Sequence, residues 1–172
     1  MKETVQIGNL TISSGKATVS DPCYDTDVWC KGVVENVLNG TYLSYVVKNN
    51  DKKWGTRNFY LIVHHECIGL PDIDDSRWKK EGFEVGVDSG QAGIYDAEHY
   101  HGGEDNYGDD GWYDECCNQT LNTKHKAGMV SDSHGVVSSS GYGDGGYDCK
   151  TIRHKGEGKK VVAIMIDFGC EG

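Results

Sequence analysis

Polar side chains and glycines are concentrated between residues 136 and 149 of this 172-residue chain. The segment reads V-V-S-S-S-G-Y-G-D-G-G-Y-D-C, so hydroxyls and carboxylates lie among glycines. Glycine permits positive φ and close approach to a ligand, and successive N–H groups can form an anion-binding concavity. The segment predicts either a polar binding loop, with Ser139, Ser140, Tyr142 and Asp144 as its hydrogen-bonding groups, or a tight bulged hairpin. It is not a P-loop, because Gly-x-x-x-x-Gly-Lys-Ser/Thr is absent.

Carboxylates suggest a second kind of chemistry. Residues 88–93, D-S-G-Q-A-G, contain Asp88 and predict in the simplest case an Asp-capped turn. If Asp88 or Asp96 instead meets Asp21 and Asp144 at one end of a sandwich, the like charges favour a hard cation such as Ca²⁺ or Mg²⁺. No EF-hand loop is present, so the candidate metal ligands are a dispersed set. They are Asp88, Asp96 and Asp144.

Histidine and cysteine show no recognisable zinc or nucleophile motif. His99 and His101 would share one face of an extended segment, but zinc needs three or four converging ligands. Cys23 as a nucleophile would need a nearby base, such as His65 or His134, and an oxyanion donor, and the spacing indicates neither. The Gly-x-Ser-x-Gly elbow is also absent. Surface or packed histidines and a buried Cys23 are the simpler interpretation.

Charge and cysteine content restrict the partners and the compartment. The net charge is −10, from 17 basic and 27 acidic residues, which argues against a protein that binds the nucleic-acid backbone. The seven cysteines are odd in number and include no Cys-x-x-Cys pair, which favours reduced thiols in the cytoplasm. The N-terminal residues show no apolar signal-peptide region, and the longest apolar run, 161–166, is too short to span a membrane.

The elements that would position these residues are mostly strands, because hydrophobic residues recur with a period of two. The predicted strands are residues 4–12, 16–19, 33–38, 42–47, 58–66, 83–87, 92–95, 127–130, 135–138, 147–153 and 161–168. Asn39-Gly40 predicts a type I′ hairpin between two of them, and segments 58–66 and 161–168 are expected to be central. The fold class predicted is mainly β: one domain over residues 1–172, an antiparallel β-sandwich of about ten short strands.

One packed α-helix is predicted after the acidic run at residues 104–110, which is otherwise interpreted as a solvated loop. Asp109 or Asp110 would cap the helix, and the first turn would begin near Trp112. The expected apolar face consists of Trp112, Tyr113, Cys116, Cys117 and Leu121. A second, short turn is expected at residues 74–80, with Trp78 as its anchor.

Four segments together resemble a known family. They are V-S-D-P-C-Y (19–24), V-D-S-G-Q-A-G (87–93), G-W-Y-D (111–114), and 135–147 followed by 161–168. In this order they are similar to the uncharacterised phage and bacterial proteins called domain-of-unknown-function 4241, over nearly the whole chain. The resemblance implies one β-rich domain, often phage-encoded, and no established activity. It places Asp21, Asp88, Gln91, Tyr142 and Asp144 at motif positions, whereas segment 99–105 is not part of the pattern.

These observations lead to a functional hypothesis with two alternatives. The hypothesis is a non-enzymatic cytoplasmic protein that binds a small polar, nucleotide-like ligand and sequesters a host defence signal. The expected ligand-binding residues are Asp21, Tyr24, Asp88, Gln91, Ser140, Tyr142 and Asp144. The alternatives are a metal-assisted hydrolase that uses the same carboxylates, and an interaction module with an exposed aromatic patch. Convergence of Asp21, Asp88 and Asp144 in space would favour a pocket over scattered turns.

Overall fold

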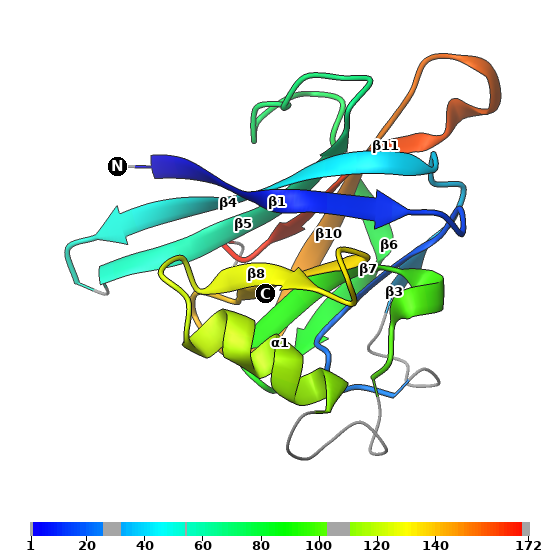
Figure 1. Cartoon of the computed structure of the whole chain (residues 1–172). Coiled ribbons are helices and arrows are strands. Elements are labelled where there is room, and N and C mark those ends of the chain that lie inside the picture. The colour runs from blue at the N-terminus through cyan, green and yellow to red at the C-terminus, as the bar shows by residue number, and fades with distance from the viewer. Residues whose placement is uncertain (1, 26–31, 54, 103–110, 170–172) are drawn as a thin grey trace.

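The computed structural model describes residues 2–25, 32–53, 55–102 and 111–169. Within them, eleven strands form two antiparallel sheets that pack face to face (Figure 1). The six-stranded sheet has the order β1 (Lys2–Ile12), β4 (Gly40–Asp51), β5 (Gly55–His65), β11 (Val161–Asp167), β10 (Gly145–Arg153) and β6 (Lys79–Val87). The five-stranded sheet has the order β3 (Gly32–Val34), β2 (Ala17–Ser20), β7 (Gln91–Asp96), β9 (Gly135–Ser139) and β8 (Ala127–Val130). The predicted mainly-β sandwich with one helix is confirmed.

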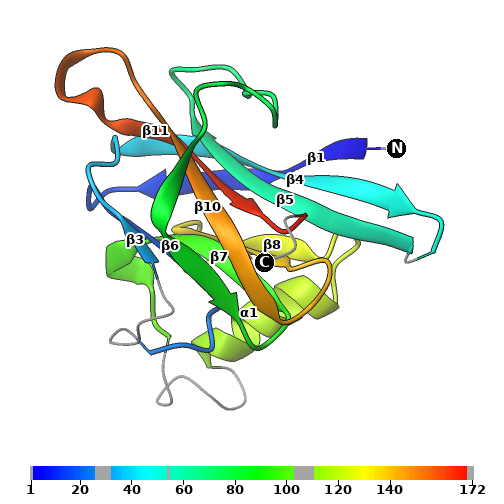
Figure 2. The same cartoon turned by 180° about the vertical axis from the view of Figure 1, so that it is seen from behind.

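The space between the sheets is filled by alternate side chains of both. Leu61 and Val63 of β5 meet a layer from the other sheet that includes Ala92 and Ile94 of β7. The larger of these side chains, Leu61, Val63 and Ile94, each contribute roughly 1.5–3 kcal/mol when fully buried, so this layer is the main source of stability. Figure 2, seen from behind, shows β11 between β5 and β10 in the six-stranded sheet.

The outer faces of both sheets are partly covered by other segments, which explains why some strands are apolar along their whole length. All seven residues of β11 are buried, because Trp78 and Ile68 pack on the outer face of that sheet. Trp78 is anchored by its indole N–H, which donates to the Asp72 carbonyl at 2.8 Å. β5 and β11 are therefore central strands, as their sequences predicted.

The outer face of the five-stranded sheet is covered by α1 (Trp112–Leu121). Trp112 and Cys116 pack with Tyr95 and Val137, and the buried helix positions are Trp112, Cys116 and Thr120. The predicted apolar face was therefore wrong at its end, because Leu121 is 67% exposed. The N-cap is Gly111, and the predicted caps at positions 109 and 110 lie outside the described residues.

The Asn39-Gly40 hairpin prediction was wrong. β3 pairs with β2 in one sheet, whereas β4 begins at Gly40 in the other, so residues 35–39 connect the two sheets. Instead, the Asn39 side-chain oxygen accepts the Gly15 N–H at 2.7 Å. The backbone carbonyl oxygen of Asn39 lies 3.1 Å from His65 Nε2. Tertiary contacts thus override a strong local turn signal.

The glycine-rich segment also connects the two sheets. β9 pairs with β7 and β8, while β10 pairs with β11 and β6, so the hairpin interpretation of residues 136–149 was wrong. Residues 140–144 form the crossover, with left-handed backbone at Gly141 (φ 72°) and Gly143 (φ 91°). None of the described helices has the length and apolar character needed to cross a membrane.

Candidate functional site

Three polar segments meet at the turn between β6 and β7, residues 88–90. Asp21, at the end of β2, is fully buried, and its carboxylate accepts the backbone N–H groups of Asp88 (2.8 Å) and Ser89 (2.6 Å). It also accepts the Ser89 hydroxyl at 2.6 Å and the Cys23 N–H at 2.9 Å. Four donors thus compensate for the burial of a charged group, and Asp21 anchors this turn to the D-P-C-Y segment.

Two tyrosines strengthen the same junction. The Tyr24 hydroxyl donates to Asp88 Oδ2 at 2.5 Å. The Tyr100 hydroxyl donates to the Tyr24 carbonyl at 2.5 Å and lies 3.0 Å from the Asp21 carbonyl. Burial, with a smaller contribution from the Asp21 charge, raises the pKa of Tyr100, so its hydroxyl remains a donor at neutral pH.

The glycine-rich crossover supplies the third segment. Asp144 Oδ1 accepts the Gly90 N–H at 3.0 Å, and the Ser140 N–H donates to the Gly90 carbonyl at 3.0 Å. The structure therefore brings Asp21, Asp88 and Asp144 to one turn, although they lie far apart in the sequence. The 88–90 turn, together with Asp21, Tyr24, Asp88 and Asp144, forms the 88–90 junction.

The crossover holds its shape through internal bonds. The hydroxyls of Ser140 and Tyr147 both donate to the Gly143 carbonyl, at 2.7 and 2.8 Å. Arg57 of β5 donates to the Gly141 carbonyl at 2.8 Å. A β-carbon at Gly141 would collide with the Asn58 carbonyl, so glycine is required there for both space and backbone conformation.

The seven predicted ligand-binding residues divide by exposure. Asp88, Tyr142 and Asp144 are exposed, and Tyr24 is partly exposed. Asp21, Gln91 and Ser140 are buried and have internal partners, so the expectation that they line a pocket needs correction. Gln91 faces α1, where its amide donates to Cys117 Sγ at 3.4 Å and accepts the Thr120 hydroxyl at 3.1 Å.

The predicted metal set of Asp88, Asp96 and Asp144 is not brought together. Asp96 is the last residue of β7, whereas the 88–90 turn precedes its first residue. Five steps of about 3.4 Å along an extended strand separate the two ends by roughly 17 Å. At that separation Asp96 cannot share an ion with the other two carboxylates.

Asp96 instead belongs to a second polar group at the far end of β7. Its buried carboxylate accepts the Ser13 N–H (3.3 Å), the Ser13 hydroxyl (2.9 Å), the Ser14 N–H (3.3 Å) and the Ser14 hydroxyl. Its Oδ2 also lies 3.0 Å from His99 Nδ1. Burial opposes ionisation of Asp96, but hydrogen bonds from Ser14, Ser13 and His99 outweigh it and lower the pKa.

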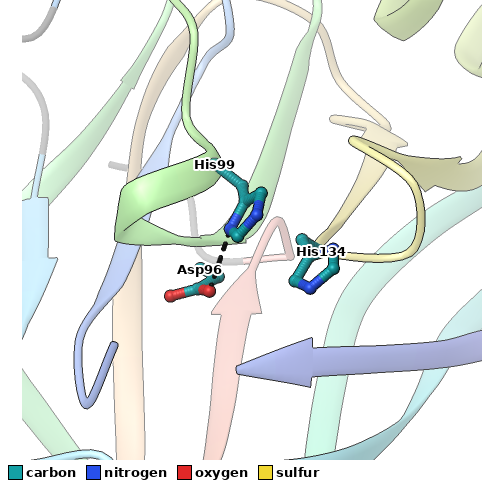
Figure 3. A group of neighbouring side chains, drawn as sticks. All are labelled: Asp96, His99 and His134. Carbon is teal, nitrogen blue, oxygen red and sulfur yellow. Dashed lines mark hydrogen bonds and ion pairs between the residues drawn. The ribbon is translucent and has the colours of Figure 1, made fainter. Parts of the chain in front are cut away.

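His134 completes this group, which sequence reasoning missed (Figure 3). A nitrogen of His99, a nitrogen of His134 and an oxygen of Asp96 lie within 4.8 Å of one another, the one group of this kind among the described residues. The two imidazole rings are stacked, with centroids 3.9 Å apart and planes 16° apart. The expected partner of His99 was His101, whose ring instead lies against Trp112. The signal that could have placed His134 here was the pairing of β7 with β9, because His134 directly precedes β9 and Asp96 is the last residue of β7.

The thiols provide no activated nucleophile in the described residues. Burial, together with the charge of Asp21, raises the pKa of Cys23. Burial likewise raises the pKa of Cys116 and of Cys149, so these thiols remain protonated at neutral pH. The described cysteines form no disulfide with one another, and their reduced state stays a prediction: Cys23, Cys67, Cys116, Cys117 and Cys149.

Exposed apolar side chains are scattered rather than grouped. Among the described residues the large ones are Val33, Leu70, Leu121 and Tyr142, which lie on four separate segments. The Tyr142 ring contacts Phe59, with centroids 5.5 Å apart. The aromatic patch expected of an interaction module is therefore not seen in this part of the chain.

No protein-family model, curated protein or solved structure matches the chain.

Proposed function

We propose that this protein binds a small polar ligand at the 88–90 junction, through the exposed carboxylates of Asp88 and Asp144. One observation carries the proposal: both carboxylates are fixed at the same turn, each through one oxygen. Among the described residues no donor reaches Asp88 Oδ1 or Asp144 Oδ2. Two preorganised acceptors of this kind lower the entropic cost of binding a ligand that carries donors.

The charges at the junction define the chemistry of the ligand. Asp21, Asp88 and Asp144 make the turn acidic, so hydroxyl, amino or cationic groups are favoured and phosphate is repelled. A nucleotide-like ligand would therefore be held by its sugar hydroxyls or its base amino group. The net charge of −10 adds to this preference and disfavours nucleic acid as a partner.

Binding rather than turnover is proposed because, among the described residues, the junction has no activated thiol and no histidine beside its carboxylates. The Cys23 thiol is protonated, and the described histidine group lies at the other end of β7. A cytoplasmic role in sequestering a host signal follows from the resemblance to the phage-encoded family, which supplies that part of the proposal by analogy.

The test is a thermal-shift and calorimetry screen of the wild-type chain against nucleosides, nucleotides, simple sugars, polyamines and Ca²⁺. A ligand at one hundred times its dissociation constant stabilises the folded state by about 2.7 kcal/mol. For a chain of this length that free energy raises the melting temperature by roughly 5–11 °C. The double substitution Asp88→Asn and Asp144→Asn should abolish the shift, since it removes both charges but keeps an oxygen acceptor at each position.

Asp74→Asn is the matched control, because Asp74 is an exposed acid away from the junction. It should retain the full shift. The proposal fails if the folded wild type binds no member of the panel, or if the double variant binds as tightly as the wild type.

A further inference from the structure

We propose that His99 and His134 bind one divalent ion of the zinc class, with Asp96 as the residue that positions His99. This site is separate from the 88–90 junction and does not depend on its function. The first support is the proximity of the three side chains, whose nearest ligand atoms lie within 4.8 Å of one another (Figure 3). They come from the end of β7, from the 3-10 turn η1 (Ala97–His99) and from the turn between β8 and β9.

The hydrogen bonds of His134 determine which nitrogen is available. Its Nδ1 lies 3.1 Å from the Ser131 carbonyl and 3.0 Å from the Asp132 carbonyl. Carbonyl oxygens only accept hydrogen bonds, so Nδ1 carries the proton. In the neutral ring Nε2 then has the free lone pair that a metal requires.

His99 shows the same arrangement with a carboxylate. Its Nδ1 lies 3.0 Å from Asp96 Oδ2, so Nδ1–H donates to Asp96 and Nε2 keeps its lone pair. A carboxylate that orients a metal-binding imidazole in this way is a recurrent feature of zinc sites. Asp96 itself is already saturated by Ser13 and Ser14, which is why it is assigned a positioning role.

The backbone that carries His134 gives independent support. Ser131, Asp132 and Ser133 are consecutive non-glycine residues with positive φ, at 54°, 51° and 69°. Left-handed backbone costs roughly 1–2 kcal/mol per residue, and such strain persists where surrounding contacts over-determine it, often at functional sites. Trp112 Nε1 donates to the Ser131 hydroxyl at 2.7 Å, and that hydroxyl donates to the His99 carbonyl at 2.9 Å. The strained turn that carries His134 is thus fastened to α1 and to the segment that carries His99.

Binding requires a small rotation of the rings. Stacked imidazoles direct their lone pairs nearly parallel, whereas two nitrogens on a tetrahedral zinc ion, at about 2.1 Å each, lie roughly 3.4 Å apart. The His99 side chain is 35% exposed, so it has room to turn. Two imidazoles are one fewer than the three protein ligands of an open zinc site, so water molecules would fill the remaining coordination positions and the affinity is expected to be modest.

The test is titration of the whole chain with Zn²⁺ by calorimetry, with thiols kept reduced. The wild type should bind one equivalent at this site, and His134→Gln should weaken that binding at least tenfold. His154→Gln is the matched control, since His154 is an exposed histidine on another loop and its loss should leave the affinity unchanged. Asp96→Asn should weaken binding by about 10–100-fold, the usual effect of losing an orienting partner.

Two further readouts separate this site from the cysteines and from misfolding. In the wild type, Zn²⁺ should shift the imidazole ¹⁵N resonances of His99 and His134 and leave that of His154 in place. Co²⁺ should give the absorption of nitrogen and oxygen ligands without a thiolate charge-transfer band. Unshifted His99 and His134 resonances, a thiolate band, or unchanged affinity in His134→Gln would each overturn the proposal.

Discussion

Replacing Asp21 by asparagine tests the physical account of the 88–90 junction most directly. The carboxylate is buried and accepts four hydrogen bonds, two at each oxygen. An asparagine amide offers one acceptor oxygen and one donor group. In the best arrangement its oxygen keeps the N–H groups of Asp88 and Ser89, and the Ser89 hydroxyl rotates to accept from the amide nitrogen. The Cys23 N–H then has no acceptor.

The cost can be estimated from these bonds. Each of the three surviving bonds weakens by about 1 kcal/mol when its acceptor loses the charge, and the unsatisfied N–H costs about 1–3 kcal/mol. Relief from burying a charged group offsets part of that loss. We therefore expect Asp21→Asn to lower the free energy of unfolding by roughly 3 kcal/mol, a large share of the 5–15 kcal/mol typical of a domain.

Urea unfolding followed by circular dichroism measures this loss, with the slope m expected to stay constant while the midpoint falls. Asp88→Asn is the control: Asp88 is exposed, and an amide oxygen can still accept the Tyr24 hydroxyl. That change should stay within about 0.5 kcal/mol of the wild type. A loss below about 1 kcal/mol for Asp21→Asn would refute the claim that its four bonds hold the junction.

Two further predictions concern the far end of β7 and the crossover. Ser14→Ala removes a hydroxyl donor from the buried carboxylate of Asp96 and should cost about 1.5 kcal/mol at pH 7. The pKa of Asp96 is lower in the folded state than its ordinary value of 3.8. The stability that ionised Asp96 contributes is therefore present above pH 3.8 and is lost as pH falls through the folded-state pKa. The urea midpoints of the variant and the wild type should therefore converge as the pH is lowered from about 7 to about 2. Gly141→Ala should destabilise more than Gly143→Ala in thermal melts, since both have positive φ but only Gly141 lies against the Asn58 carbonyl. Equal losses at the two glycines would contradict that steric account.

The strands could be predicted because their signal is local. Segment 161–168 is apolar throughout, which indicated a strand covered on both faces, and β11 is covered by the opposite sheet and by Trp78. The helix was also predicted, and so was the burial of Trp112 and Cys116, but the last turn of its buried face was not. That turn depends on contacts from other elements: Thr120 meets Gln91 of β7, while Leu121 is exposed.

The candidate sites show the same division. The sequence identified Asp21, Asp88 and Asp144 as residues of interest, and Asp96 was grouped with them because alternation alone does not tell which end of a strand faces which neighbour. His134 was not paired with His99, because the pairing of β7 with β9 decides that contact.

The sequence by itself determined the period-two strands and a polar chemistry of carboxylates and hydroxyls. These follow from backbone conformation and hydrophobic alternation, which act over a few residues. Only the tertiary structure decided that the glycine-rich segment crosses between sheets, that Asp21 is buried as an anchor, and that Asp96 joins two histidines at the opposite end of β7. Those outcomes depend on which strands pair, and pairing is set by burying both apolar faces of the sandwich at once.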